Sequence, residues 1–265
     1  MKLKLMQITH IARYEVQLHW RGRALLVMML AILVMNGITA LVMSQSSDSM
    51  PPGLVINHSA MAWATIGVTL AFLLPVIISD TVPKDRQFGV RELLDTLPVS
   101  RGVVLLGKLL GVYAAVLSGL AVIMLITGAL DLLLFGEVNV SSFLEIWLVG
   151  TTGMVILNGG LGVLLPATQP NRRRAVVLVI AVLILSFALS GSGFESGSMD
   201  TYFNPIRPSI IMYYLTGVAG TFGGSAVSQF TREDVWLSIG AGLVELVVIG
   251  LAVWGWSRWH ESRAG

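Results

Sequence analysis

The chain has 265 residues, of which 55% are hydrophobic and 12% charged, and its mean hydropathy is +0.80. Soluble domains carry about 25% charged residues, so this composition excludes an ordinary soluble protein and indicates an integral membrane protein. The formal net charge is +2 and cysteine is absent, which excludes disulfides, thiol catalysis and cysteine-ligated metal sites.

Six apolar runs are long enough to cross the hydrocarbon core of a bilayer, about 30 Å thick, which takes roughly 20 helical residues. In chain order they are 24–44, 61–79, 103–130, 143–166, 175–193 and 235–257. The third run is the longest and ends in Asp131, so we expect its membrane portion to be shorter. The sequence therefore predicts one all-α integral membrane domain over residues 1–265 with six transmembrane helices.

Residues 3–20 precede the first run and carry an apolar stripe. The stripe consists of Ile8, Ile11, Tyr14 and Leu18. It predicts an N-terminal interfacial helix lying on the inner membrane surface, with an ordinary polar lead-in to the first span as the alternative.

The charged insert Asp80–Lys108 separates the second and third runs. Its apolar residues recur at i, i+3, i+4 and i+7, the spacing of a short amphipathic helix, and are Val90, Leu93, Leu94 and Leu97. Gly89 precedes this helix, Pro98 ends it, and Ser100 is expected to cap the third span.

The outer segment 203–231 follows the fifth run. Its uncharged part, 209–231, is diluted by glycine, serine and threonine, which favours short outer helices over a seventh span. A seventh crossing would also place Arg258 and Arg263 outside.

Lysine and arginine fix the expected orientation, because positive charges stay on the cytoplasmic side of short loops. With the N-terminus inside, 15 of the 17 Lys and Arg residues are cytoplasmic, and only Arg207 and Arg232 are outside. Both termini are therefore expected in the cytoplasm.

Gly102–Lys108 imitates the nucleotide-binding pattern G-x-x-x-x-G-K. Leu109 stands where a Ser or Thr would reach Mg²⁺, and the match opens an apolar helix instead of following a strand. We therefore expect no nucleotide binding and no ATPase activity in this chain. The histidines are scattered along the sequence, so no metal site is expected either.

Small and polar residues inside the spans offer further candidates. Gly107 and Gly111 allow close helix approach, which favours packing within one subunit over a dimer contact. Polar groups at membrane depth are functional suspects, so Asn36, Asn158 and Glu245 could line a translocation pathway or form interhelical hydrogen bonds. Hydrogen bonding is favoured for the two asparagines, and both readings stay open for Glu245.

This layout resembles the permease subunits of ABC-2 type transporters. The most specific part is the insert, where that family shows an acidic–basic pair, a glycine, a short amphipathic helix, a proline, Ser-Arg and then Gly-Lys. The corresponding residues are Asp85-Arg86, Gly89, Val90–Leu97, Pro98, Ser100-Arg101 and Gly107-Lys108.

In that family the short helix is the coupling helix, which docks into a groove of a separate ATP-hydrolysing subunit. The resemblance implies a coupling segment over residues 80–102. The implied contacts to the ATPase subunit are Asp85, Arg86, Gly89, Val90, Arg91, Leu93, Leu94, Asp95, Leu97, Pro98 and Arg101. The basic loop Arg172–Arg174 would form a second contact or hold the loop at the lipid surface.

The resemblance therefore implies an export permease of the cytoplasmic (inner) membrane, with ATP and Mg²⁺ bound by the partner and no cofactor in this chain. Its expected partners are ABC ATPase subunits, a second or related permease copy and membrane lipids, and no nucleic acid. The alternatives are an ion-coupled secondary transporter, a lipid-modifying enzyme and a membrane scaffold. An apolar bundle of this kind suits lipids, peptides, drugs or glycans as substrate.

Overall fold

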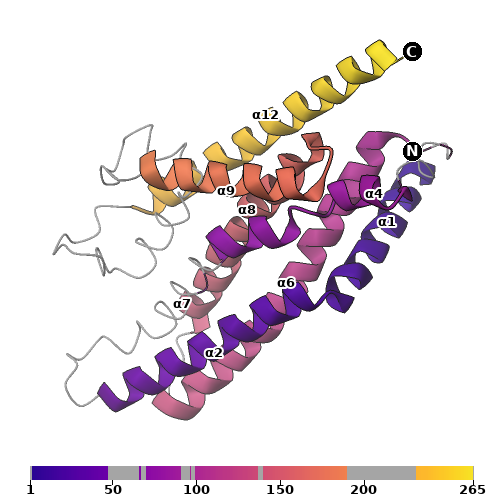
Figure 1. Cartoon of the computed structure of the whole chain (residues 1–265). Coiled ribbons are helices and arrows are strands. Elements are labelled where there is room, and N and C mark those ends of the chain that lie inside the picture. Colours follow the sequence, from indigo (N-terminus) through magenta and orange to yellow (C-terminus); the bar gives the residue numbers. More distant parts are fainter. Residues whose placement is uncertain are drawn as a thin grey trace.

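The computed structural model describes residues 2–46, 66, 70–90, 96, 99–136, 140–189 and 231–264. All regular elements in these ranges are helical (Figure 1), which confirms the all-α prediction. In chain order they are α1 (Lys2–Arg21), α2 (Arg23–Ser46), a helix over 70–78, α4 (Pro83–Gln87), α6 (Arg101–Phe135), α7 (Val140–Glu145), the π-helical η3 (Ile146–Thr151), α8 (Thr152–Leu164), η4 (Pro166–Thr168), α9 (Arg172–Leu189) and α12 (Arg232–Ala264).

Four of the described helices are long and apolar enough to cross a membrane. They are Arg23–Val42, Arg101–Leu134, Trp147–Thr168 and Glu233–Trp256, which correspond to the first, third, fourth and sixth expected spans. The second expected span lies partly outside the described residues, and α9 carries the described part of the fifth. Those two spans stay predictions, as do the outer helices of 203–231, which also lie outside the described residues.

Helix α6 is longer than the sequence indicated. Its 35 residues extend about 50 Å at 1.5 Å per residue, well beyond the roughly 30 Å of a hydrocarbon core. The helix continues past Asp131, which is buried, and ends at Gly136, whose φ of 73° and N–H bond to the carbonyl of Leu132 close the last turn. Ser100 occupies the N-cap position in an extended conformation, but its side chain makes no capping hydrogen bond, contrary to our expectation.

Helices α1 and α2 follow α6 in the same direction (Figure 1), with a break at Gly22 between them. The indole nitrogen of Trp20 in α1 donates to the hydroxyl of Ser118 at 3.2 Å. Further along, the amide nitrogen of Asn36 in α2 donates to the hydroxyl of Thr127 at 3.3 Å. Residue numbers rise along α1 and α2 in the same direction as along α6. The two helices therefore pack parallel to α6, one after the other.

This packing changes the interpretation of the N-terminal helix. Ile11 of the expected membrane stripe faces Gly107 of α6, whereas Tyr14 of the same stripe is exposed. The stripe is divided because α6 covers one side of it. The position of α1 relative to a membrane stays a prediction.

The core lies where α2, α6, α8 and the helix over 70–78 meet. Of the four apolar segments, Trp147–Thr168, which contains α8, has 72% of its apolar window buried, and Glu233–Trp256 of α12 has only 17%. Glycine permits the close approach to α8, because a Cβ on Gly162 would lie 2.7 Å from the Cα of Pro75. The core includes Leu25, Met28, Ile32, Leu70, Leu74, Ile78, Val112, Val116, Leu120, Met154 and Val155.

Candidate functional site

A buried lysine joins three separate parts of the chain. The ammonium of Lys108, in α6, lies 3.0 Å from Glu15 Oε1 of α1 and 3.0 Å from Asp85 Oδ2 of α4. It also donates to the carbonyl of Thr81 at 3.2 Å. We refer to Lys108, Glu15, Asp85 and Thr81 as the Lys108 cluster.

The Lys108 cluster shows what the lysine of the P-loop-like pattern Gly102–Lys108 contacts in this chain. In a P-loop the lysine contacts phosphates, whereas here two carboxylates and a carbonyl surround Lys108. The side chains of Lys108 and Glu15 are 7% and 1% exposed. A buried lysine requires partners of this kind, because an unpaired buried charge is strongly unfavourable.

Two glycines let α1 approach α6 closely at the cluster. A Cβ on Gly107 would lie 2.7 Å from the Cβ of Ile11. A Cβ on Gly111 would lie 2.6 Å from the Cβ of Glu15 and 2.7 Å from the carbonyl oxygen of Ala12. The spacing Gly-x-x-x-Gly therefore serves packing within this chain, the interpretation that the sequence favoured.

We expect Gly111→Ala to destabilise the fold by about 1–3 kcal/mol, because the added methyl group meets backbone as well as side-chain atoms of α1. The measurement is thermal unfolding of the purified chain in detergent. Gly102→Ala is the matched control in the same helix, since a Cβ there meets nothing within 4 Å. Equal melting temperatures for the two variants would contradict the close packing of α1 on α6.

Burial perturbs two ionisable groups of α1. Removal from water raises the pKa of the Glu15 carboxyl, although the charge and hydrogen bond of Lys108 oppose this shift. Burial likewise lowers the pKa of His19, and the charge of Asp80 opposes that shift. The Nε2 atom of His19 lies 3.5 Å from the hydroxyl of Thr81, so His19 lies beside the Lys108 cluster to which Glu15 belongs.

The lowered pKa of His19 predicts a loss of stability in acid. The unfolded chain binds the proton more readily, so the free energy of unfolding falls as the pH drops through the ordinary value of 6.5. His19→Gln should reduce the difference between melting temperatures at about pH 7.5 and about pH 5.5. The raised pKa of Glu15 has the opposite effect on stability, since it favours the folded chain at low pH. The control is His10→Gln, which makes the same substitution at an exposed histidine of α1. If the melting temperature of His19→Gln falls between the two pH values as much as that of the unaltered chain, His19 is not the source of the acid sensitivity.

The two inner loops of the predicted topology are joined by an ion pair. Asp80 Oδ2, after the second expected span, lies 3.3 Å from Arg172 Nε, at the start of α9. Asn171 precedes α9 and caps it, because its side-chain oxygen accepts the N–H of Arg174 at 3.0 Å.

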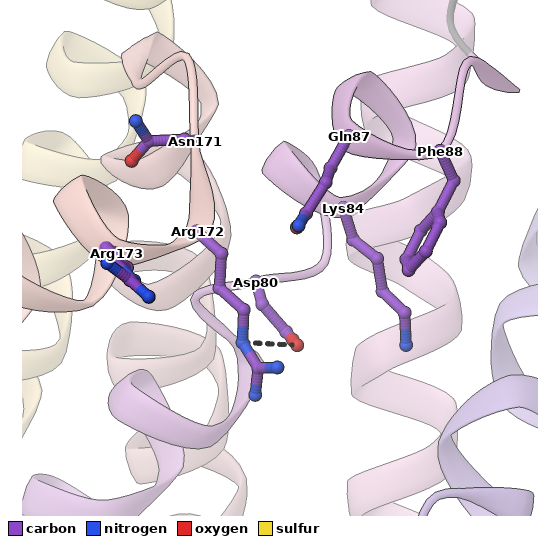
Figure 2. Close-up of a pocket in the computed structure, with 7 residues that line it drawn as sticks. All are labelled: Asp80, Lys84, Gln87, Phe88, Asn171, Arg172 and Arg173. Carbon is purple, nitrogen blue, oxygen red and sulfur yellow. Dashed lines mark ion pairs between the residues drawn. The ribbon is translucent and has the colours of Figure 1, made fainter.

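An open pocket of about 690 Å³ lies beside this pair (Figure 2). It is lined by Asp80, Lys84, Gln87, Phe88, Asn171, Arg172 and Arg173. The pocket therefore gathers more positive than negative charge between the loop containing α4 and the start of α9.

The structure places only part of the expected ATPase contact. Asp85 is half-buried in the Lys108 cluster, and Gly89 adopts a left-handed conformation with φ of 70°. Val90 is 40% exposed and Arg101 is also exposed. The other expected contacts lie outside the described residues or have an undescribed side chain: Arg86, Arg91, Leu93, Leu94, Asp95, Leu97 and Pro98. The docking face of the coupling helix thus stays a prediction.

The polar residues expected inside the spans have different surroundings. Asn36 forms the interhelical hydrogen bond to Thr127 described above. Asn158 instead donates to the carbonyl of Met154 in its own helix at 3.1 Å. Glu245 of α12 is half-buried. Among the described residues no group of three or more His, Asp or Glu side chains could hold a metal ion.

Sequence reasoning missed Glu15, although a signal was present. It is the only acidic residue among the first 47 and follows Ile8 and Ile11 on one helical face. A single carboxylate on an apolar stripe indicates a buried partner, but nothing local identified Lys108, 93 positions away.

The sequence matches the family described as ABC-2 family transporter protein over residues 50–251. A comparison with curated proteins gave no match. The matched range covers more than half of the chain. It includes every residue that lines the pocket and, of the Lys108 cluster, all but Glu15. The chain therefore belongs to the ABC-2 family of transporter proteins and is a multi-pass transmembrane permease.

Proposed function

We propose that this chain is the permease subunit of an ATP-driven exporter in the cytoplasmic membrane. Two permease copies, or one copy and a related permease, form the pathway, and two separate ATPase subunits bind beneath them. Both termini lie in the cytoplasm. The observation that carries this proposal is the Lys108 cluster, which ties the insert between the second and third spans to both α1 and α6.

The cluster gives the insert a mechanical role. Asp85 lies on α4, close before the segment 89–101 in which docking is expected, and its carboxylate is held by Lys108 of α6. A displacement of the insert is therefore transmitted to α6, and through Glu15 to α1. Switching between inward and outward access requires such rigid elements with two arrangements.

ATP is expected to bind elsewhere in the complex. Lys108, the lysine that a P-loop would direct at phosphates, is committed to Glu15 and Asp85. This assignment supports a division of the complex into a permease and a separate ATPase. ATP-driven closure of the ATPase subunits would then move the coupling helices of two permeases.

A second copy has apolar surface available. The face of α12 exposes Val244, Val248 and Leu251, and α2 exposes Leu26 and Leu30. In one chain these side chains meet lipid, and in a dimer some of them would meet the partner copy. The low buried share of α12, 17%, supports a role at such an outer surface.

The test is purification of the tagged chain from native membranes in a mild detergent. We expect an ABC ATPase to co-purify and the complex to hydrolyse ATP, whereas the chain expressed alone hydrolyses none. Purification without any ATPase, combined with substrate movement that depends on an ion gradient, would overturn the proposal in favour of a secondary transporter.

A further inference from the structure

We propose that the pocket between α4 and α9 binds the phosphate headgroup of an anionic lipid, whose acyl chain lies along the exposed face of α9. This inference goes beyond transport and uses the predicted orientation, which places the pocket at the inner leaflet. Figure 2 shows the side chains that line the pocket, with Arg172 and Lys84 extending on either side of Asp80.

The charges of the pocket suit a phosphate. Three cationic side chains line it, Lys84, Arg172 and Arg173, against the single carboxylate of Asp80. The ion pair to Asp80 engages Arg172 through Nε, at 3.3 Å. The guanidinium of Arg172 carries two further nitrogens that can donate hydrogen bonds. Arginine binds phosphate oxygens in bidentate fashion, and lysine adds a point charge.

The remaining lining fits a headgroup at the boundary of water and hydrocarbon. The amides of Gln87 and Asn171 line the same pocket, whose volume is about 690 Å³. Phe88 contributes an aromatic ring that is 68% exposed. Within the part of the chain that the structure describes, neither Lys84 nor Arg173 forms a close ion pair, and the charge of Lys84 acts only at longer range on Glu15 and His19.

An apolar track leads away from the pocket along α9. Arg173, Val177, Ile180 and Ile184 follow one another at i, i+4, i+7 and i+11, so they share one helical face. Val177, Ile180 and Ile184 are 65%, 39% and 64% exposed. A guanidinium above a row of exposed aliphatic side chains matches a phosphate above an acyl chain.

The track decides between two anionic partners. An acidic surface of the ATPase subunit would match the charge of the pocket, but it would not contact the apolar face of α9 that continues from Arg173. An anionic lipid satisfies both, and basic pockets at the inner ends of transmembrane helices bind such headgroups. The lipid is therefore the favoured occupant.

The experiment compares lipid retention by the purified full chain, without ATPase, using native mass spectrometry. The probes are phosphatidylglycerol and phosphatidylcholine with identical acyl chains, and glycerol 1-phosphate as the free headgroup. We expect a preference for phosphatidylglycerol of roughly tenfold, which Lys84→Gln/Arg173→Gln abolishes. Lys4→Gln/Arg13→Gln, which removes two exposed charges from α1, should keep the preference.

Four outcomes would overturn the proposal. The first is equal retention of both lipids by the unaltered chain, and the second is the same loss in the α1 control. The third is binding of glycerol 1-phosphate as tight as that of phosphatidylglycerol, which would indicate a general phosphate site. The fourth is an unchanged lipid preference in the pocket variant; loss of the ATPase from the same variant in a separate co-purification would then identify the pocket as a protein contact. The lipid measurement uses the chain without ATPase. The exporter proposal can therefore fail without changing the lipid result, and the two failures are distinguishable.

Discussion

Lys108→Met is expected to lower the free energy of unfolding by about 3–5 kcal/mol, because it leaves the Glu15 carboxylate buried without a counter-ion. The side chain of Glu15 is 1% exposed, so water cannot replace the lysine. Asp85, whose side chain is 20% exposed, recovers part of its hydration and contributes less. The measurement is equilibrium unfolding of the chain in mixed detergent micelles.

The pH dependence of this variant separates charge from shape. Burial already raises the pKa of Glu15, and loss of Lys108 raises it further, so the carboxyl takes up a proton more readily in the variant. The loss should therefore shrink as the pH falls. Glu15→Met/Lys108→Met should recover most of the stability, since apolar replacement of a buried pair is often neutral. A loss below about 0.5 kcal/mol for Lys108→Met would show that the cluster does not hold α1.

Leu93→Asp/Leu94→Asp is expected to weaken binding of the ATPase subunit at least about a hundredfold. Burial of one leucine contributes about 1.5–3 kcal/mol, and the two introduced carboxylates would have to be desolvated in the groove. The measurement is the amount of ATPase that co-purifies with the tagged chain at fixed ATPase concentration.

The control for this variant is Leu3→Asp/Met6→Asp, which makes the same chemical change on α1. Leu3 and Met6 are 69% and 59% exposed, so the fold should tolerate both substitutions. We expect this control to retain the ATPase. Complete retention by Leu93→Asp/Leu94→Asp would exclude docking through that helix.

Composition and hydropathy predicted the membrane class and most helix positions, because both depend on local properties. An apolar run long enough to span a bilayer identifies α2, α6 and α12 without knowledge of their neighbours. The helix ends were less accurate. Asp131 looked like a terminus by its charge, but it is buried against the bundle and the helix closes only at Gly136.

The Lys108 cluster could not be predicted, because its partners meet only through tertiary packing. Lys108 was noticed as part of an imitated phosphate loop, and Asp85 through the resemblance, but nothing in the sequence paired them. The same applies to Asp80 and Arg172, which are 92 positions apart in the chain and lie 3.3 Å apart. Spacing along a helix reveals which side chains share one face of that helix, but not which other helix that face packs against.

The chain contains no cysteine, so a single introduced thiol can report which part of it lies against the ATPase. The decisive measurement attaches a thiol-reactive photocrosslinker to Leu94→Cys in the coupling segment or to Leu133→Cys, which is 80% exposed near the other end of α6. We predict a crosslink to the ATPase subunit from position 94 and none from position 133. A crosslink from position 133 alone, or from neither position in an intact complex, would contradict the assignment of residues 89–101 as the ATPase contact.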